Sequence, residues 1–215
     1  MMAGQCRLRQ SALPASLAAW LLACTPGHAH GLAGGSPLDE LAAGFGAPLD
    51  VAAALLLIAA AGICAALWDS NRFTRLGWGL LAGTAAGPLM AWLLARSGIA
   101  IPHWPALALG IALALMTALA RRWSAALMRS LLAAAGCLAV IATLLDHAVG
   151  DLTFFTGAGL VLGVVFFTAA SAAAFSLPQM LLPPGIARLG LRIVASWTGA
   201  IAILLLAFTL RGAVG

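Results

Sequence analysis

Four side chains of this 215-residue chain have the types and spacing of a cation site: Asp50, Asp146, His147 and Asp151. Asp146 and His147 are adjacent, and Asp151 follows four residues after His147. Carboxylate oxygens and imidazole nitrogens are ligands that suit Ni²⁺, Co²⁺ or Zn²⁺. These residues therefore predict a metal or proton contact, and the alternative is that they are ordinary solvated residues at loop ends.

The elements that must position these residues are continuous apolar stretches. Such stretches occur at Leu49–Trp68, Gly77–Ala95, Pro105–Ala120, Ala125–Leu145, Leu152–Phe175 and Leu191–Leu210. A helix rises about 1.5 Å per residue, so about 20 apolar residues cross a bilayer core of about 30 Å. The runs are continuous rather than alternating, which favours helices over a barrel. The predicted fold is all-α, a polytopic membrane bundle of six transmembrane helices.

Composition supports a lipid environment. The chain is 63% hydrophobic and 8% charged, whereas soluble domains carry about 25% charged residues. All eleven basic residues are arginines, and they are scattered rather than grouped in a patch. The lipid bilayer is therefore the predicted partner, and no nucleic-acid binding is expected.

The chain begins with the pattern of a secretory signal peptide. Arg7 and Arg9 precede an apolar core and a small-residue region that ends at Ala29. The predicted organisation is a signal peptide at 1–29, a periplasmic N-terminal tail at 30–48 and a transmembrane domain at 49–212. Lipidation at Cys24 and an uncleaved seventh helix are the alternatives, and cleavage after Ala29 would leave His30 as an amino-terminal chelator.

The distribution of arginine predicts the orientation. Seven arginines fall on one side of the six stretches and two on the other: Arg72, Arg75, Arg121, Arg122, Arg129, Arg188 and Arg192 against Arg96 and Arg211. The arginine-rich side is expected to face the cytoplasm. This places the mature N-terminus in the periplasm and the chain in a bacterial inner membrane.

The acidic residues have the opposite distribution. Apart from Asp69, they all fall on the predicted outer side, namely Asp39, Glu40, Asp50, Asp146 and Asp151, and His103 and His147 are placed there too. An acidic face raises the local concentration of cations. The outer mouth is therefore the predicted point of cation entry.

Glycine and proline predict how the helices pack and where they end. Gly79, Gly83 and Gly87 recur every four residues, as do Gly159 and Gly163, and such small-residue faces indicate tight helix packing, with a hinge or a dimer contact as alternatives. Prolines at 178, 183 and 184 predict a long loop over Ser176–Gly190.

Cys64 and Cys137 are interpreted as small core residues, with soft-metal binding as the alternative.

Three short segments resemble the HupE/UreJ family of nickel permeases. They are Ala47-Pro48-Leu49, Gly110-Ile111-Ala112-Leu113 and His147-Ala148-Val149-Gly150, and the similarity runs in order from about Gly44 to Leu210. The resemblance implies a six-helix permease for a divalent cation such as nickel or cobalt. The cation would be the transported substrate, and no resident cofactor is implied.

Most of the family's metal ligands are replaced in this chain. The histidine of its His-Pro-Leu motif falls on Ala47, and its Asp-His pair falls on Ala53 and Ala54. A glutamate and a further histidine fall on Ala108 and Thr168. Alanine supplies no donor atom to a dehydrating cation.

Two functional hypotheses follow. The first is a permease that admits a metal cation through a mouth built from Asp50, Asp146, His147 and Asp151. The second is a non-transporting accessory or scaffold protein that keeps the bundle and has lost the ion path. An enzyme is not expected, because neither His103 nor His147 lies in the interior of an apolar stretch and the chain has no Gly-x-Ser-x-Gly motif and no lysine.

Overall fold

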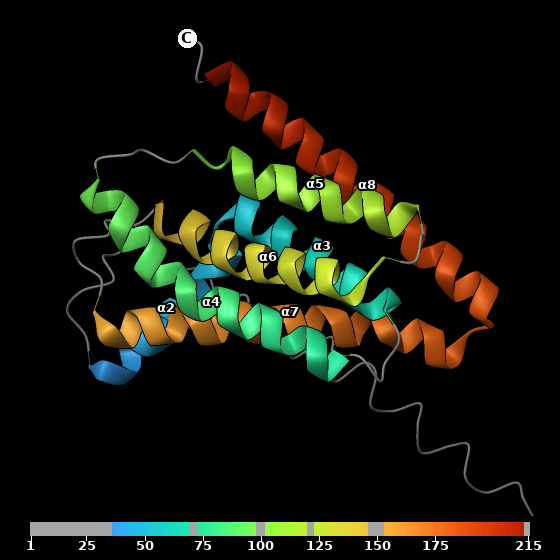
Figure 1. Cartoon of the computed structure of the whole chain (residues 1–215), viewed down its shortest axis with the longest axis horizontal. Helices are drawn as coiled ribbons and strands as arrows, with labels where there is room; N and C mark the ends of the chain where they lie inside the picture. Colours follow the sequence, from blue (N-terminus) through green and yellow to red (C-terminus); the bar gives the residue numbers. More distant parts are fainter. Residues whose placement is uncertain (1–35, 69–72, 98–101, 120–122, 146–152, 213–215) are drawn as a thin grey trace, which may run out of the picture. The chain divides into compact units, whose positions relative to one another are not determined.

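A computed structural model describes residues 36–68, 73–97, 102–119, 123–145 and 153–212. The described part is all helical, as predicted (Figure 1). Its helices are α2 (Pro37–Asp50), α3 (Ala52–Leu67), α4 (Phe73–Arg96), α5 (Trp104–Ala118), α6 (Ala125–Leu145), α7 (Phe154–Leu181) and α8 (Pro184–Gly212). The predicted signal peptide at 1–29 lies outside the described residues.

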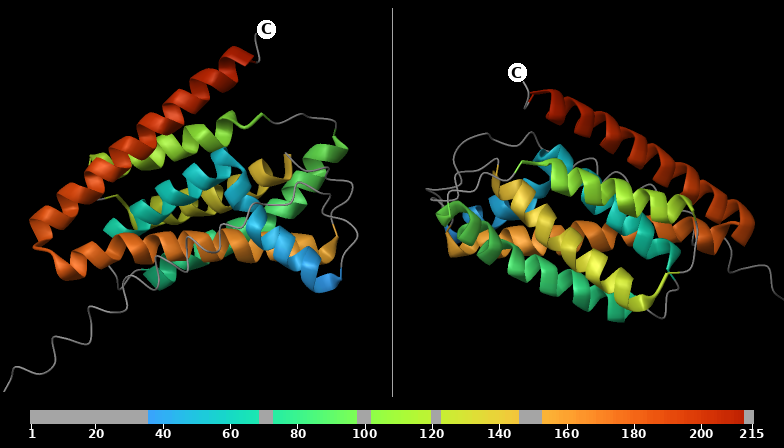
Figure 2. Two further views of the ribbon diagram at one scale, coloured as in Figure 1. Left: turned by 180° about the vertical axis from the view of Figure 1, so that it is seen from behind. Right: turned by 45° about the horizontal axis from the view of Figure 1, so that its top comes forward.

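Each of the helices α3 to α8 overlaps one of the six apolar stretches, and successive helices alternate in direction along the bundle (Figures 1 and 2). Four of them, α4, α6, α7 and α8, are long and apolar enough to cross a membrane. Helices α2 and α3 would form a fifth span only as one bent pair, with an angle of 81° between them. Helix α5 has 15 residues and is therefore about 22 Å long, which is shorter than the hydrocarbon core.

The prediction of a long loop over Ser176–Gly190 is wrong, because α7 continues to Leu181 and α8 begins at Pro184. Pro178 lies inside α7, and its carbonyl still accepts a 2.9 Å hydrogen bond from the Leu182 amide. Leu182 is extended, with φ −112° and ψ 156°, as expected for a residue before proline. Pro184 suits the first position of a helix, since that amide has no partner within the helix. The break between α7 and α8 is therefore two residues long, Leu182 and Pro183.

Helix α2 occupies the segment expected to be a tail. Ser36 and Asp39 form a capping box at its start, in which the Asp39 amide donates to Ser36 Oγ and the Ser36 amide donates to Asp39 Oδ2. The Ser36 hydroxyl also donates to Asp39 Oδ2 at 2.8 Å. The bonds from this hydroxyl and from the Ser36 amide lower the pKa of the Asp39 carboxyl below its ordinary value. Helix α2 ends at the extended residue Val51, where the chain bends into α3.

The glycine faces pack helices against one another within the chain, so the intramolecular interpretation is confirmed. A Cβ atom at Gly83 of α4 would collide with the backbone of Ala133 in α6. A Cβ atom at Gly159 of α7 would collide with the backbone of Leu41 in α2. The pairs α4–α6 and α2–α7 are accordingly in extensive contact.

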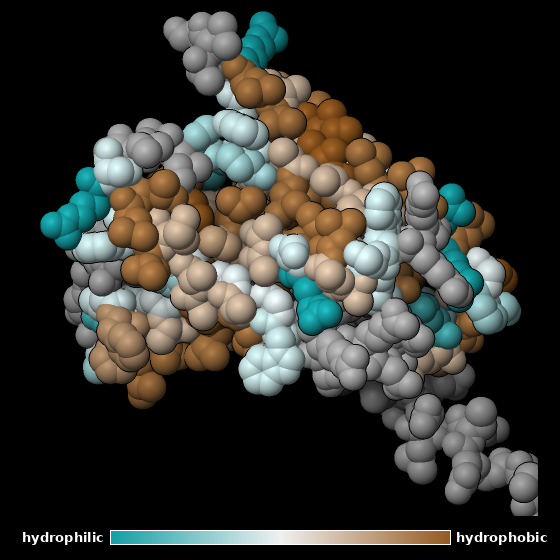
Figure 3. All heavy atoms as spheres, viewed as in Figure 1, coloured by the Kyte–Doolittle hydropathy of each residue, from teal (hydrophilic) through white to brown (hydrophobic). Residues whose placement is uncertain are grey.

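Large apolar side chains cover much of the outer surface of the bundle. On α8, Trp197 is 71% exposed, Leu204 57% and Phe208 63%. Figure 3 shows hydrophobic residues along α8 over most of its length. Apolar surface of this extent is unfavourable in water and is suited to contact with lipid tails.

Candidate functional site at the acidic end of the bundle

One end of the bundle collects the starts of α5 and α7 and the ends of α4, α6 and α8 (Figures 1 and 2). The acidic residues other than Asp69 are predicted to lie at this end. Arg96, at the end of α4, lies over the ring of Trp92, with its guanidinium carbon 5.2 Å from the ring centroid. This cation–π contact engages the charge of Arg96 within its own helix.

Of the four predicted site residues, the structure describes Asp50. It is the last residue of α2, is exposed, and directly precedes the bend at Val51. Asp146, His147 and Asp151 lie outside the described residues, between Leu145 of α6 and Thr153, the N-cap residue of α7. The clustering of the four residues therefore remains a prediction.

The structure adds Glu40, which belongs to the predicted N-terminal tail. Glu40 is half-buried, and its Oε2 accepts a hydrogen bond of 2.6 Å from the hydroxyl of Thr153. Thr153 Oγ1 also lies 3.0 Å from Thr156 Oγ1 and accepts a hydrogen bond from the Thr156 amide at 3.2 Å. A carboxylate of α2 is thereby joined to the first turn of α7.

The donor in each of these hydrogen bonds follows from the fact that a threonine hydroxyl has a single proton to donate. Thr153 has one hydroxyl proton, and the short contact to Glu40 uses it. The contact between the two threonine hydroxyls must then have Thr156 as donor and Thr153 as acceptor. The result is a directed chain from Thr156, which is 1% exposed, through Thr153 to the carboxylate of Glu40.

A local signal in the sequence could have revealed α2. Serine followed by proline, with an acidic residue three positions after the serine, is a typical helix start, and Ser36, Pro37 and Asp39 form this pattern. The richness in glycine and alanine instead suggested a tail. The partner of Glu40 had no such signal, because Thr153 is 113 residues away in the sequence.

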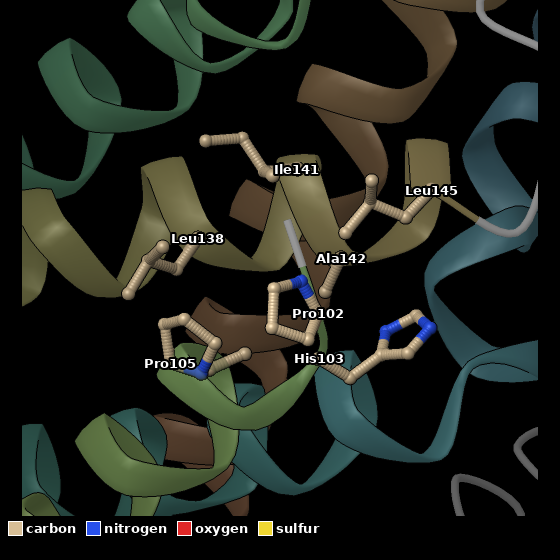
Figure 4. A pocket seen from close by; sticks show the side chains of 8 residues that line it. Pro102, His103, Pro105, Leu138, Ile141, Ala142 and Leu145 are labelled. Atoms are coloured by element: carbon tan, nitrogen blue, oxygen red, sulfur yellow. The ribbon is translucent and has the colours of Figure 1, made fainter. Parts of the chain in front are cut away.

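A small hollow lies between the start of α5 and the end of α6 (Figure 4). It is lined by Pro102, His103, Pro105, Ala106, Leu138, Ile141, Ala142 and Leu145. The space open to a water-sized sphere is about 10 Å³, which is near the minimum for one water molecule. His103 is half-buried at the edge of this hollow, and the rest of the lining is apolar.

Threonine supplies the buried polar groups of the bundle interior. Thr84, Thr117 and Thr168 each donate a hydrogen bond to a carbonyl four residues earlier in the same helix, at 3.0, 2.8 and 2.7 Å. Cys64 of α3 is buried beside Thr117 of α5. Among the described residues, no group of three or more His, Cys, Asp or Glu side chains could hold a metal ion.

The opposite end of the bundle carries two side chains that cap neighbouring helices. Gln179 of α7 donates from Nε2 to the carbonyl of Ala66 in α3 at 2.7 Å. Arg192 of α8 donates from Nε to the carbonyl of Ala118 in α5, also at 2.7 Å. These bonds satisfy carbonyls in the last turns of α3 and α5, which have no partner within the helix.

Comparison with known proteins gives no match to a family model, to a curated protein or to a solved structure. The class of the protein therefore rests on its own fold and surface. An all-helical bundle with several long apolar helices and an exposed apolar surface indicates a multi-pass membrane protein.

Proposed function

We propose that the chain is a HupE/UreJ-like permease of the bacterial inner membrane that moves a divalent cation such as nickel or cobalt. In this proposal the signal peptide is removed, the mature N-terminus is periplasmic, and α3 to α8 are six spans. The bend between α2 and α3 and the short α5 are accommodated inside the bundle. The segmental resemblance in the sequence supports this choice of family.

The observation that carries the proposal is the carboxylate of Glu40 at the start of α7. Glu40 lies in the first turn of α2 and is bonded to Thr153, the N-cap residue of α7. The segment directly before that residue contains Asp146, His147 and Asp151. Negative charge at this end attracts cations electrostatically, and carboxylate and imidazole groups suit nickel and cobalt.

Passage beyond the mouth would use weaker donors. Within the described interior, the polar groups are threonine hydroxyls and Cys64 rather than carboxylates. A threonine hydroxyl that donates to its own helix still has an oxygen lone pair that can face a cation. The proposed path therefore combines strong ligands at the entrance with hydroxyl and carbonyl oxygens inside.

The second candidate, a non-transporting accessory protein, is favoured by the packing of the interior. The α4–α6 and α2–α7 contacts bring backbones together at glycines, and the buried threonine hydroxyls are satisfied inside their own helices. Such an interior needs no ion in order to be stable. The two candidates make opposite predictions about metal uptake.

Cellular nickel and cobalt, measured by mass spectrometry in a deletion strain, separate the two candidates. Complementation with the wild-type chain should restore accumulation, and Asp146→Ala or His147→Ala should abolish most of it. Asp39→Asn is the control, because Asp39 is an exposed acidic residue of α2 that is predicted on the same side of the membrane and lies outside the proposed mouth. Equal metal content with the wild-type chain and with an empty vector would instead support the accessory protein.

A further inference from the structure

We propose that Glu40 is a positioning residue of the mouth: through Thr153 it fastens α2 to α7 and fixes where α7 begins. The helix start that it holds directly follows the segment with Asp146, His147 and Asp151. The consequence for transport rests on the proposed function. The fastening of α2 to α7 rests on the hydrogen bonds alone.

The bond is well suited to hold the two helices. A hydroxyl-to-carboxylate hydrogen bond of 2.6 Å has the short length typical of a charge-assisted bond, which is stronger than a neutral one. Thr153 Oγ1 donates to Glu40 and accepts from the Thr156 amide and hydroxyl, so its hydrogen-bonding capacity is full. A fully satisfied polar network of this kind rigidifies its surroundings.

The contact also sets the register of α2 on α7. Below Glu40 the two helices touch at Gly44, which lies against the backbone of Thr156, and at Gly163, which lies against the backbone of Phe45. The ring of Phe45 packs on Phe166 and Phe167 with centroid distances of 5.3 and 5.1 Å. These apolar contacts are not directional, whereas the Glu40 bond is. A shift of α2 by one residue would separate Glu40 from Thr153 and leave a half-buried carboxylate without this partner.

The start of α7 favours a carboxylate in this position. The amide ends of a helix carry partial positive charge, which a nearby anion stabilises. Thr153 is the N-cap residue of α7 and accepts from the Thr156 amide. The charge of Glu40 is thereby connected to the helix terminus through one hydroxyl. Oε2 of Glu40 is engaged in this bond, and the role proposed for the carboxylate is to place the start of α7 rather than to bind the cation.

Substitutions at Glu40 and Thr153 separate positioning from direct binding. Glu40→Gln keeps an acceptor without the charge, so it should preserve part of the fastening. Thr153→Ser keeps the hydroxyl, so it should preserve the fastening. Glu40→Ala and Thr153→Val remove it, although Thr153→Val also removes the N-cap of α7, which makes Glu40→Ala the more direct variant. Asp39→Asn is the matched control, because the bonds of Asp39 described here are to Ser36.

Two measurements on the full-length chain test the inference. Hydrogen exchange of the α2 amides should accelerate about tenfold in Glu40→Ala, as expected for loss of one hydrogen bond to a charged group. It should accelerate less in Glu40→Gln, which keeps an acceptor without the charge, and should stay within about twofold of wild type in Asp39→Asn. The KM for nickel uptake should rise in Glu40→Ala and rise less in Glu40→Gln.

Each contrary outcome has a distinct meaning. Unchanged α2 exchange in Glu40→Ala would overturn the fastening. An equal rise in KM for Glu40→Gln and Glu40→Ala would show that the charge itself meets the cation, and would overturn the positioning role. If the wild-type chain takes up no nickel, the proposed function fails, whereas the exchange experiment still decides whether Glu40 fastens α2.

Discussion

Threonine is the residue type that carries the buried polar chemistry of this protein. In the described part of the chain, all six polar side chains classed as buried are threonines: Thr84, Thr117, Thr143, Thr156, Thr168 and Thr198. A threonine can bond to the carbonyl one turn earlier in its own helix, and it can therefore be buried at little cost. Thr156 differs from the others because its hydroxyl bonds to Thr153 in the network that contains Glu40.

We expect Thr84→Val and Thr168→Val to change the free energy of unfolding by less than about 1 kcal/mol, because valine has the same shape and removes a donor together with its need for a partner. Thr156→Val should cost about 1–2 kcal/mol, since it removes one bond of an inter-helix network. Thermal unfolding in detergent measures all three. A Thr168→Val variant that is stable but has lost metal uptake would show that this hydroxyl lies on a transport path.

Single residues were predictable where their signal is local. The position of Asp50 at the start of an apolar stretch could be read directly from the sequence, whereas the gathering of the acidic residues at one mouth stays a prediction. The bond between Glu40 and Thr153 could not be read from the sequence, because it joins residues 113 positions apart and depends on how α2 lies on α7. The same holds for Gln179, whose partner Ala66 is also 113 positions away.

At the scale of helices, glycine spacing predicted close packing, and the structure adds the partners. Each tight glycine meets the backbone of a specific neighbour, which sequence spacing alone cannot identify. Helix α2 offers a matched pair for testing this, since Gly44 lies against α7 whereas a Cβ atom at Gly46 would meet nothing within 4 Å.

Gly44→Ala should destabilise the protein by about 1–3 kcal/mol, the usual cost of inserting a methyl group into a filled contact. Gly46→Ala should stabilise it by about 0.5–1 kcal/mol, because alanine loses less backbone entropy in a helix. Thermal unfolding of the two variants, together with hydrogen exchange in α2, checks both signs. Equal effects of the two substitutions would contradict the α2–α7 contact.

The bond from Arg192 to Ala118 leads to a prediction about α5. Arg192→Ala should increase hydrogen exchange in the last turn of α5 and reduce stability by about 1 kcal/mol, because a helix-end carbonyl loses its donor. Arg188→Ala is the matched control, since Arg188 is also exposed and lies one turn earlier in α8. If Arg188→Ala has the same effect as Arg192→Ala, net charge rather than capping stabilises the end of α5.

Helix boundaries were predictable from hydropathy and less so from proline. The apolar stretches match α3 to α8 because burial in lipid requires continuous apolar sequence. The loop over Ser176–Gly190 was overestimated, because Pro178 removes one hydrogen bond without ending α7 and Pro184 is compatible with a helix start. Helix α2 was missed because its sequence is rich in glycine and alanine, and such a composition alone does not distinguish a helix from a loop.

On the scale of the whole molecule, the two ends of the bundle differ in chemistry. One end has the carboxylate of Glu40 beside the start of α7, and the other has Arg188 and Arg192 and the capping bonds to α3 and α5. The apolar side chains of α8 and its neighbours lie between the two ends. In a membrane, this asymmetry orients the protein, because basic residues are retained on the cytoplasmic side.

Reporter fusions test this orientation. Alkaline phosphatase, which is active only in the periplasm, should be active when fused after Ser97 or after Arg211, at the ends of α4 and α8. A fluorescent protein that matures only in the cytoplasm should be bright when fused after Leu119 or after Leu182. This pattern follows because successive helices from α3 to α8 alternate in direction. Phosphatase activity after Leu182 would place the arginine-rich end in the periplasm, and the acidic end could then no longer be a periplasmic entrance for cations.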